Sequence, residues 1–260
     1  MNRRAALVSL ALAALTASAF AAAPANSFNL ITSAGKNVGN AAYTITKDKN
    51  GYHVVGKFQY KLGSSMQTDS KTGGTSMNST IAFNEGQFYE DFKVSEDGTF
   101  LSGYTQNATN QVMTSFQPNK AGNLVTVNQI QGGISLGSRD FPLPKPGFLV
   151  VPDFDPATMQ VFITTALAHP HDDKTYLFLV PAGANARGND TSLYVILQLA
   201  PDTPSGTLDS KPVKVTHYIL NYHVGKADLF TDDTGTLMQV DMGPLNISYI
   251  RAKFALAAAK

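Results

Sequence analysis

The densest group of potential metal ligands in the chain is the segment 169–173, which reads His-Pro-His-Asp-Asp. Imidazole and carboxylate groups at this spacing can hold zinc or another divalent ion, with His217 or His223 as a further ligand. The competing interpretation is a polar loop leaving a helix, where a histidine near the last carbonyls is favoured by the helix dipole. A metal-dependent hydrolase built on this loop is therefore one candidate function, the least favoured of three. Its candidate residues are His169, His171 and Asp173.

Paired carboxylates are the other candidates for acid–base chemistry. Most of them stand in turns or helix caps, where aspartate is expected for conformational reasons. Nothing in their spacing brings two of them to one cleft. We therefore assign no catalytic residue and no cofactor, and favour a protein that is not an enzyme. The pairs are Glu90-Asp91, Glu96-Asp97, Asp153 with Asp155, Asp172-Asp173 and Asp232-Asp233.

The first residues have the three parts of a secretory signal. Arg3 and Arg4 form a basic start, an apolar run follows from position 5 to about position 20, and small residues come after it. Ala19-Phe20-Ala21 is the best Ala-x-Ala match, so we expect cleavage after Ala21. The apolar run is too short to cross a bilayer, which takes about 20 residues. The alanine-rich segment is typical of bacteria, so the expected destination is the periplasm or the medium.

The charge and cysteine content exclude several classes of function. Removing Arg3 and Arg4 leaves 18 basic and 19 acidic residues, and no basic cluster remains to follow a phosphate backbone or an anionic membrane. The chain has no cysteine, which excludes thiol chemistry, a disulfide scaffold and an acylated lipoprotein cysteine. We therefore expect no nucleic-acid partner and no integral membrane segment after signal cleavage.

The dominant hydrophobic period is two. In the segment 52–62, Tyr52, Val54 and Phe58 alternate with His53 and Lys57, which is the pattern of an antiparallel strand with one solvated face. A turn at 47–51 predicts a hairpin between this strand and 38–46. Similar segments at intervals of about 10–15 residues indicate an antiparallel meander, sandwich or barrel. Strands are predicted at 28–33, 38–46, 52–62, 76–83, 87–94, 100–106, 112–116, 124–129, 175–180, 193–199, 213–222, 226–231, 237–241 and 246–254.

One segment has the helical period instead. Asp155 is a good N-cap, and proline at 156 suits the first helical position. Apolar residues then recur at helical spacing, which predicts an amphipathic helix over 156–168 that packs on a sheet. The predicted fold is mainly β: a large curled antiparallel sheet, as a half-barrel or open barrel, with this helix on it, or alternatively a β-sandwich. We expect a single domain over 22–260, with a possible boundary between sub-lobes near 142–155.

The strands at 175–180 and 193–199 are apolar on both faces, so both faces should be covered, one of them by the helix or a ligand. This predicts a groove for a hydrophobic ligand between sheet and helix. His217, on a strand between apolar neighbours, is a possible polar anchor in such a cavity, although a half-buried structural histidine is the simpler interpretation. The candidate lining residues are Met159, Phe162, Tyr176, Phe178, Tyr194, Ile196 and His217.

The C-terminal stretch carries a resemblance to known proteins. A strand with His217-Tyr218 is followed by the segment 224–230, by the turn Asp-Thr-Gly-Thr-Leu at 233–237, and by a last strand with Tyr249-Ile250-Arg251. This order resembles uncharacterised secreted or periplasmic β-proteins of bacteria, and the early Gly-Lys-Asn-Val-Gly at 35–39 fits the same group. Such proteins are distantly similar to periplasmic lipoprotein carriers. The resemblance implies a curled antiparallel sheet around an apolar cavity under helices, and no catalytic residues.

Besides the metal-dependent hydrolase at 169–173, these observations indicate one favoured function and one alternative. The favoured function is an exported, non-catalytic protein that binds a hydrophobic small molecule or lipid between sheet and helix. The alternative is a structural or envelope-interaction module with a filled core, acting through an exposed sheet edge or an apolar patch. The sequence identifies no protein partner.

Overall fold

The computed structural model describes residues 26–61, 86–142, 149–150, 155–180, 191–222, 225–243 and 246–257. The predicted signal peptide and the strand predicted at 76–83 lie outside the described residues. Within them the fold is mainly β with one α-helix, as predicted. The elements are β1 (Asn26–Thr32), β2 (Asn37–Asp48), β3 (Gly51–Tyr60), β4 (Gly86–Val94), β5 (Phe100–Asn107), β6 (Val112–Pro118), β7 (Leu124–Gln131), β8 (Ile134–Pro142), β9 (Leu149–Val150), α2 (Pro156–Ala168), β10 (Thr175–Val180), β11 (Thr191–Leu199), β12 (Ser205–Leu208), β13 (Lys211–Lys214), β14 (Thr216–Tyr222), β15 (Gly225–Thr231), β16 (Leu237–Met242), β17 (Ile247–Arg251) and β18 (Phe254–Leu256).

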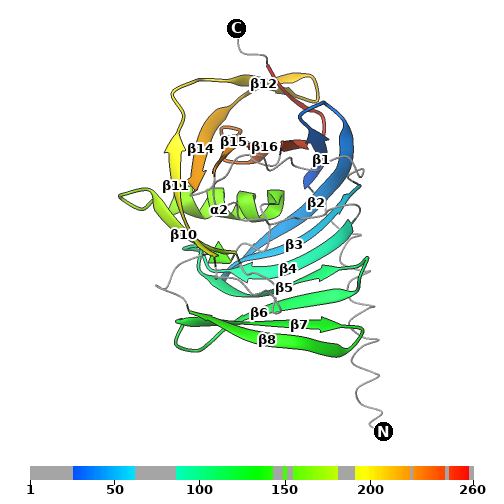
Figure 1. The fold of residues 1–260 in the computed structure, drawn as a ribbon. Helices are drawn as coiled ribbons and strands as arrows, with labels where there is room; N and C mark the ends of the chain where they lie inside the picture. Colours follow the sequence, from blue (N-terminus) through cyan, green and yellow to red (C-terminus); the bar gives the residue numbers. More distant parts are fainter. Residues whose placement is uncertain are drawn as a thin grey trace, which may run out of the picture.

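Two meanders form one curled sheet of fifteen strands (Figure 1). Strands β1 to β8 are neighbours in chain order, and the second meander runs β9-β10-β11-β14-β15-β16-β17. The halves join where β1 pairs with β17, from Phe28 opposite Arg251 to Thr32 opposite Ile247. All pairs are antiparallel except β9 with β10. The end strands β8 and β9 are not paired with each other, so the sheet is an open curl rather than a closed barrel or the alternative sandwich.

The hairpin of β2 and β3 forms as the sequence predicts. Its register runs from Gly39 opposite Tyr60 to Asp48 opposite Gly51. The Asp48 carboxylate accepts a hydrogen bond from the Asn50 backbone at 2.6 Å, and Gly51 has φ of 133°, a value that favours glycine. On β3, Val54 is fully buried while Gln59 is exposed, which is the predicted alternation of faces.

A small second sheet covers part of the outer face. Its order is β13-β12-β18, and it lies near the C-terminus at the top of Figure 1. The strand predicted at 213–222 divides into β13 and β14, and the strand predicted at 246–254 divides into β17 and β18, because the chain leaves one sheet for the other at both places. This packing forms a separate apolar cluster of Val215, Phe230, Met238 and Phe254.

The helix begins where the sequence predicts. The Asp155 carboxylate accepts hydrogen bonds from the backbone N–H groups of Ala157 at 2.7 Å and Thr158 at 3.0 Å, and Pro156 occupies the first helical position. At the other end, the backbone N–H of His169 donates to the Thr165 carbonyl. The cap satisfies two N–H groups that an uncapped helix would leave without a partner.

The helix is more deeply enclosed than an amphipathic helix would be. It lies inside the curl of the sheet (Figure 1), and Met159 and Ile163 are fully buried. Its polar side also lies inside the protein, with Thr158 and Gln160 buried, whereas Leu167 near its end is 44% exposed. The helix packs on the sheet as predicted, but its polar side is enclosed as well, because a curled sheet surrounds the helix where a flat sheet would cover only one side.

Gln160 fixes the helix to the two halves of the sheet. Its Oε1 accepts hydrogen bonds from the Tyr43 hydroxyl on β2 at 3.2 Å and from the Leu237 backbone on β16 at 2.7 Å. Its Nε2 donates to the Gly235 carbonyl at 3.0 Å and to Thr164 Oγ1 at 3.1 Å. One side chain thus satisfies polar groups from both meanders.

We expect Gln160→Ala to lower the free energy of unfolding by about 1–3 kcal/mol, because it leaves buried donors and an acceptor without partners. Urea denaturation measures this directly. Gln198→Ala is the matched control, since Gln198 is exposed and its hydrogen bond with Asn221 lies at the surface. Its effect should stay within about 0.5 kcal/mol. Equal effects of the two substitutions would contradict the assignment of Gln160 as the anchor.

Candidate functional site

Two of the predicted ligand-lining residues, Phe162 and Tyr176, meet where α2 faces β10, and a third, Met159, is buried on the same helix. Met159 and Phe162 are buried at 0% and 2% exposure and belong to the main core. The Phe162 ring meets the Tyr176 ring edge to face, with centroids 5.2 Å apart. The Tyr176 hydroxyl donates a long hydrogen bond of 3.4 Å to the Ala166 carbonyl. Phe162 and Tyr176 thus form an apolar contact between helix and sheet, and the same hydroxyl also accepts a hydrogen bond from the His171 backbone at 3.4 Å.

The other predicted lining residues do not join this contact in the part of the chain that is described. Ile196 is 39% exposed, while Val195 and Leu197 on either side of it are buried, so Ile196 lies on the outer face of β11. The prediction that both faces of this strand are covered is therefore wrong at Ile196. Phe178 and Tyr194 belong to β10 and β11, but their side chains lie outside the described residues.

His217 lies among carboxylates rather than beside the helix. Its Nδ1 is 2.7 Å from Asp202 Oδ1 and its Nε2 is 3.0 Å from Asp228 Oδ1. Its ring stacks on Phe230, with centroids 4.4 Å apart, and Phe230 belongs to the outer apolar cluster. Lys226 forms an ion pair with the same Asp228. The structure therefore holds His217 in an ionic group on the outer side of β14 and does not bring it together with Met159 or Phe162.

The loop at 169–173 likewise has structural partners. His171 Nδ1 lies 2.7 Å from the Thr175 carbonyl, and its ring stacks on Tyr176 at 4.6 Å between centroids. Asp173 accepts a hydrogen bond from the Thr175 backbone at 2.9 Å. Across the described ranges, no three His, Asp or Glu side chains are grouped so that they could hold a metal ion.

The segment 133–137 reads Gly-Ile-Ser-Leu-Gly, which matches the sequence of a hydrolase nucleophile turn. That turn requires the serine between a strand and a helix. Here Ser135 lies on the edge strand β8, opposite Ile130 of β7 in a hairpin, and it is exposed. The local structure therefore gives this serine no role as a nucleophile.

A buried pair of carboxyl groups lies under the start of the helix. Glu90 on β4 is 2% exposed and Asp155 at the N-cap is 1% exposed, and their side chains are hydrogen-bonded. Gly56 on β3 stands opposite Glu90, and any Cβ at this position would collide with the Glu90 carboxyl group. The absence of a side chain at Gly56 makes the space that Glu90 occupies.

Burial determines the protonation of the groups around this pair. It raises the pKa of Asp155, and the hydrogen bonds from Thr158, Glu90 and Ala157 act in the opposite direction. Burial also raises the pKa of Tyr43 far above its usual range; the charge of Arg251 lowers it and that of Asp155 raises it. Tyr43 therefore remains a neutral hydroxyl that donates to Gln160.

Sequence alternation contains a signal for Glu90. Phe88, Glu90, Phe92 and Val94 share one face of β4, so Glu90 is a lone acid on an apolar face. Gln160 shows the same kind of signal, as a polar residue within the apolar helix. Neither residue was among the predicted site residues, because the pairs considered were neighbours along the chain.

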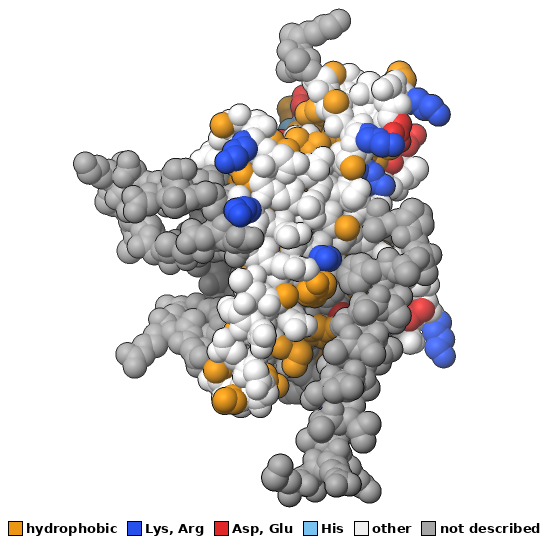
Figure 2. Space-filling view, turned by 90° about the vertical axis from the view of Figure 1, so that its right-hand side faces the viewer, with side chains coloured by type: hydrophobic (Ala, Val, Ile, Leu, Met, Phe, Trp, Pro, Cys, Tyr) orange, Lys and Arg blue, Asp and Glu red, His pale blue; other side chains and the backbone are white. Residues whose placement is uncertain are grey.

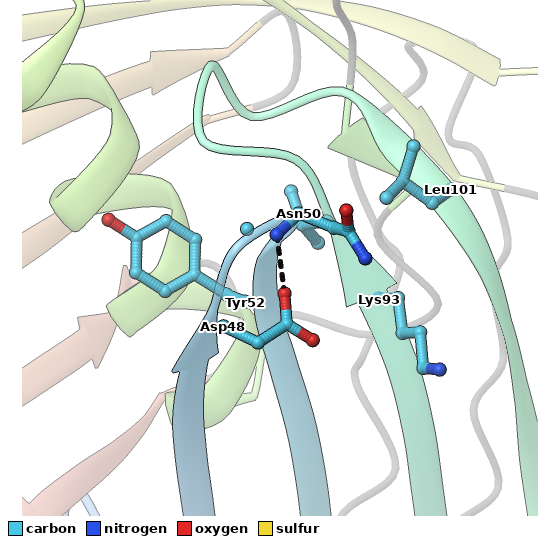
Figure 3. A pocket seen from close by; sticks show the side chains of 7 residues that line it. Asp48, Asn50, Tyr52, Lys93 and Leu101 are labelled. Carbon is cyan, nitrogen blue, oxygen red and sulfur yellow. Dashed lines mark hydrogen bonds between the residues drawn. The ribbon is translucent and has the colours of Figure 1, made fainter.

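A shallow hollow of about 80 Å³, open to solvent, lies at the β2–β3 turn (Figure 3). None of its lining residues is one of the predicted ligand-lining residues. They are Asp48, Asn50, Gly51, Tyr52, Lys93, Val94 and Leu101. On the face seen in Figure 2, charged side chains are spread out and no single basic patch stands out. Among the described residues, no helix is both long and apolar enough to span a membrane.

Comparison of the chain with protein-family models, with curated proteins and with solved structures finds no match.

We expect Gly56→Ala to lower the free energy of unfolding by about 1–3 kcal/mol, because the added methyl group displaces the Glu90 carboxyl group. In a Glu90→Ala background the cost should largely disappear, which a double-mutant cycle measures. Gly39→Ala is the matched control: its Cβ would meet backbone atoms of Gln59 and Tyr60, so its cost should be the same in both backgrounds. An equal cost of Gly56→Ala in both backgrounds would show that Glu90 is not the obstacle.

Proposed function

We propose that this protein is exported to the periplasm or the medium and binds a hydrophobic or lipid-like molecule, without catalysis, between α2 and the concave face of the sheet. The observation that carries the proposal is the arrangement of an apolar helix inside a sheet whose end strands, β8 and β9, are not paired with each other (Figure 1). Such a curl has an apolar interior that can widen without breaking the hydrogen bonds between its strands.

The aromatic lining of the interior supports this proposal. Phe88 stacks with Phe58 at 5.1 Å and with Tyr60 at 5.6 Å between centroids. Phe100 then contacts Phe92 and Phe116, each at 6.4 Å, which carries the aromatic surface across to β6. The helix packs against β2, β3 and β16. The aromatic surface therefore extends from β6 to the strands that contact the helix. An acyl chain or a fused ring system is the ligand chemistry that aromatic and aliphatic surfaces favour.

A ligand that enters between α2 and β10 breaks fewer contacts than one that enters on the side of the helix that Gln160 holds. Separating Phe162 from Tyr176 breaks one ring contact and the 3.4 Å hydrogen bond to Ala166. On the opposite side of the helix, three hydrogen bonds of the Gln160 side chain hold the helix to Tyr43, Leu237 and Gly235. The helix can therefore move away from β10 while it stays attached to β2 and β16.

The buried acids support binding rather than catalysis. A general acid or base must come within hydrogen-bond reach of its substrate. Glu90 and Asp155 are 2% and 1% exposed, and Asp155 already accepts bonds from Ala157 and Thr158. Their arrangement is that of a structural pair that orders the start of α2.

An envelope-interaction module remains the second candidate, and the outer face of β11 favours it. Ile196 is 39% exposed on this face, and Ile219 on the neighbouring strand β14 lies on the same face and is half-buried. Aliphatic side chains that share a partly exposed face are typical of a protein contact. The two candidates use opposite faces of the same strand region, so one experiment can compare them.

Export predicts a defined mature N-terminus. When the whole chain is expressed in a bacterium, we expect the periplasmic fraction to contain a protein that begins at Ala22. Intact-mass measurement of that fraction reads the cleavage point directly. An Ala21→Leu variant should be processed poorly, because the site requires a small residue there. Full-length protein retained in the cytoplasm would contradict export.

The absence of tryptophan from the chain allows a direct test of ligand position. Tyr176→Trp places a single tryptophan at the proposed contact, and Ile196→Trp places one on the outer face. We expect 9,10-dibromostearate to quench Tyr176→Trp several times more strongly than Ile196→Trp, because bromine quenches at short range. Stearate should quench neither variant, and native mass spectrometry should show it bound to both.

Equal quenching of the two variants, or stronger quenching of Ile196→Trp, would place the fatty acid on the outer face and favour the interaction module. No quenching, with no adduct by native mass spectrometry, would contradict binding of an acyl chain.

A further inference from the structure

The carboxyl pair of Glu90 and Asp155 joins the start of α2 to the middle of the sheet. Glu90 belongs to β4, Asp155 caps the helix, and both side chains are closed to solvent. Gly56 on the neighbouring strand leaves the room for the glutamate side chain. A hydrogen bond therefore connects two acidic groups across the interface on which the helix rests.

The chemistry of this bond requires a proton. Ionised carboxylates only accept hydrogen bonds, so two of them cannot bond to each other unless one is protonated. Asp155 Oδ1 accepts from the N–H groups of Ala157 and Thr158, and its Oδ2 accepts from Thr158 Oγ1 at 2.7 Å. Three donors and the positive end of the helix dipole favour the ionised form of Asp155. The proton then belongs on Glu90, which donates to Asp155.

We propose that this shared proton is a latch: while Glu90 and Asp155 hold it, the start of α2 stays on β3 and β4, and its loss releases the helix from the sheet. When both groups are ionised, two like charges face each other in a site closed to water, where repulsion is strong. Moving the helix start away, or letting water in, relieves that repulsion. The device is a pH-dependent docking of α2.

The other charged and titratable groups near the pair are neutral or have partners of their own, so the shared proton determines the charge of the pair. Tyr43 on β2 stays neutral because burial raises its pKa. Arg251 on β17 acts on Tyr43, and its guanidinium donates to the Leu237 carbonyl at 3.3 Å and to Asn26 Oδ1 at 2.7 Å. The uncharged Thr158 hydroxyl donates to Asp155 from the helix itself.

The direction of the pH effect follows from linkage. Burial raises the pKa of Asp155, so the folded pair keeps its proton to a higher pH than the unfolded chain, whose carboxyl groups ionise near pH 4, at about 3.9 for aspartate and 4.3 for glutamate. Over that interval the folded protein binds more protons than the unfolded chain. Its stability is therefore fully present below about pH 4 and falls as the pH rises through the titration of the pair.

The latch concerns the helix and needs no ligand, so it stands apart from the proposed lipid binding. If a hydrophobic molecule does bind beside α2, release of the helix start at higher pH exposes the same interior and changes the rate at which the molecule enters or leaves. The experiment below is made on the ligand-free protein, and its failure leaves the ligand-binding proposal untouched.

The test compares the mature wild-type protein with Glu90→Gln. The amide keeps the size of the side chain and still donates to Asp155, but it has no proton to lose. We expect the wild-type midpoint of thermal unfolding to fall by at least about 5 °C more than that of Glu90→Gln between about pH 5 and pH 9. Hydrogen exchange by mass spectrometry, corrected for the intrinsic effect of pH, should show α2 losing protection at the higher pH in the wild type alone.

Asp155→Asn provides a second variant that does not depend on how well the first one folds. Asparagine still caps the helix, and its amide can donate to an ionised Glu90. It should also remove the pH-dependent loss of protection in α2. Asp48→Asn changes an exposed turn carboxylate and should keep the wild-type behaviour. Parallel pH profiles for the wild type, Glu90→Gln and Asp155→Asn would overturn the proposal.

Discussion

The burial of α2 inside a curled sheet is the constraint on which the rest of the structure depends. A helix on a flat sheet can turn its polar side chains to water, but α2 is surrounded, so each polar group on it needs a partner inside the protein. Asp155 bonds the first backbone N–H groups, Gln160 bonds both meanders, and Thr165 Oγ1 donates back to the Val161 carbonyl at 3.0 Å. The polar residues of this helix hold it in place through hydrogen bonds, and its apolar residues pack in the space between them.

The order of the strands explains how the helix comes to lie inside the sheet. The first meander ends at β8 and the second begins at β9, which are the two edges of the sheet. The first and last long strands, β1 and β17, close the opposite side of the curl. The helix follows β9 and precedes β10, and these two neighbouring strands are parallel, so the chain between them must cross over one face of the sheet. Because α2 is that crossover and runs over the concave face, it lies inside the curl.

Local patterns predicted most of the elements, but not the pairing that joins them. The alternation of Val54 and Phe58 with polar residues, and the cap at Asp155, act within a few residues, and both appear in the structure as predicted. The pairing of Phe28 with Arg251 has no local signal, because the two strands stand at opposite ends of the chain. The apolar sequence around Ile196 predicted coverage of both faces, yet the outer face stays exposed there. An apolar sequence shows that a strand can be buried, but the arrangement of the other elements determines whether one of them covers it.

The candidate site shows the same division between local and distant information. Phe162 and Tyr176 meet because helix and strand follow each other closely, and that was predictable. Glu90 meets Asp155 only because β3, β4 and the helix converge, and Gly56 makes room for it from a third segment. His217 looks like a member of the interior from its apolar neighbours, yet it faces Asp202 and Asp228 on the outer side. The sheet therefore separates an apolar interior from an outer ionic group, and the fully buried acids among the described residues, Glu90 and Asp155, lie at the start of α2. A movement of the helix can change the interior without disturbing the contacts that hold the second meander together.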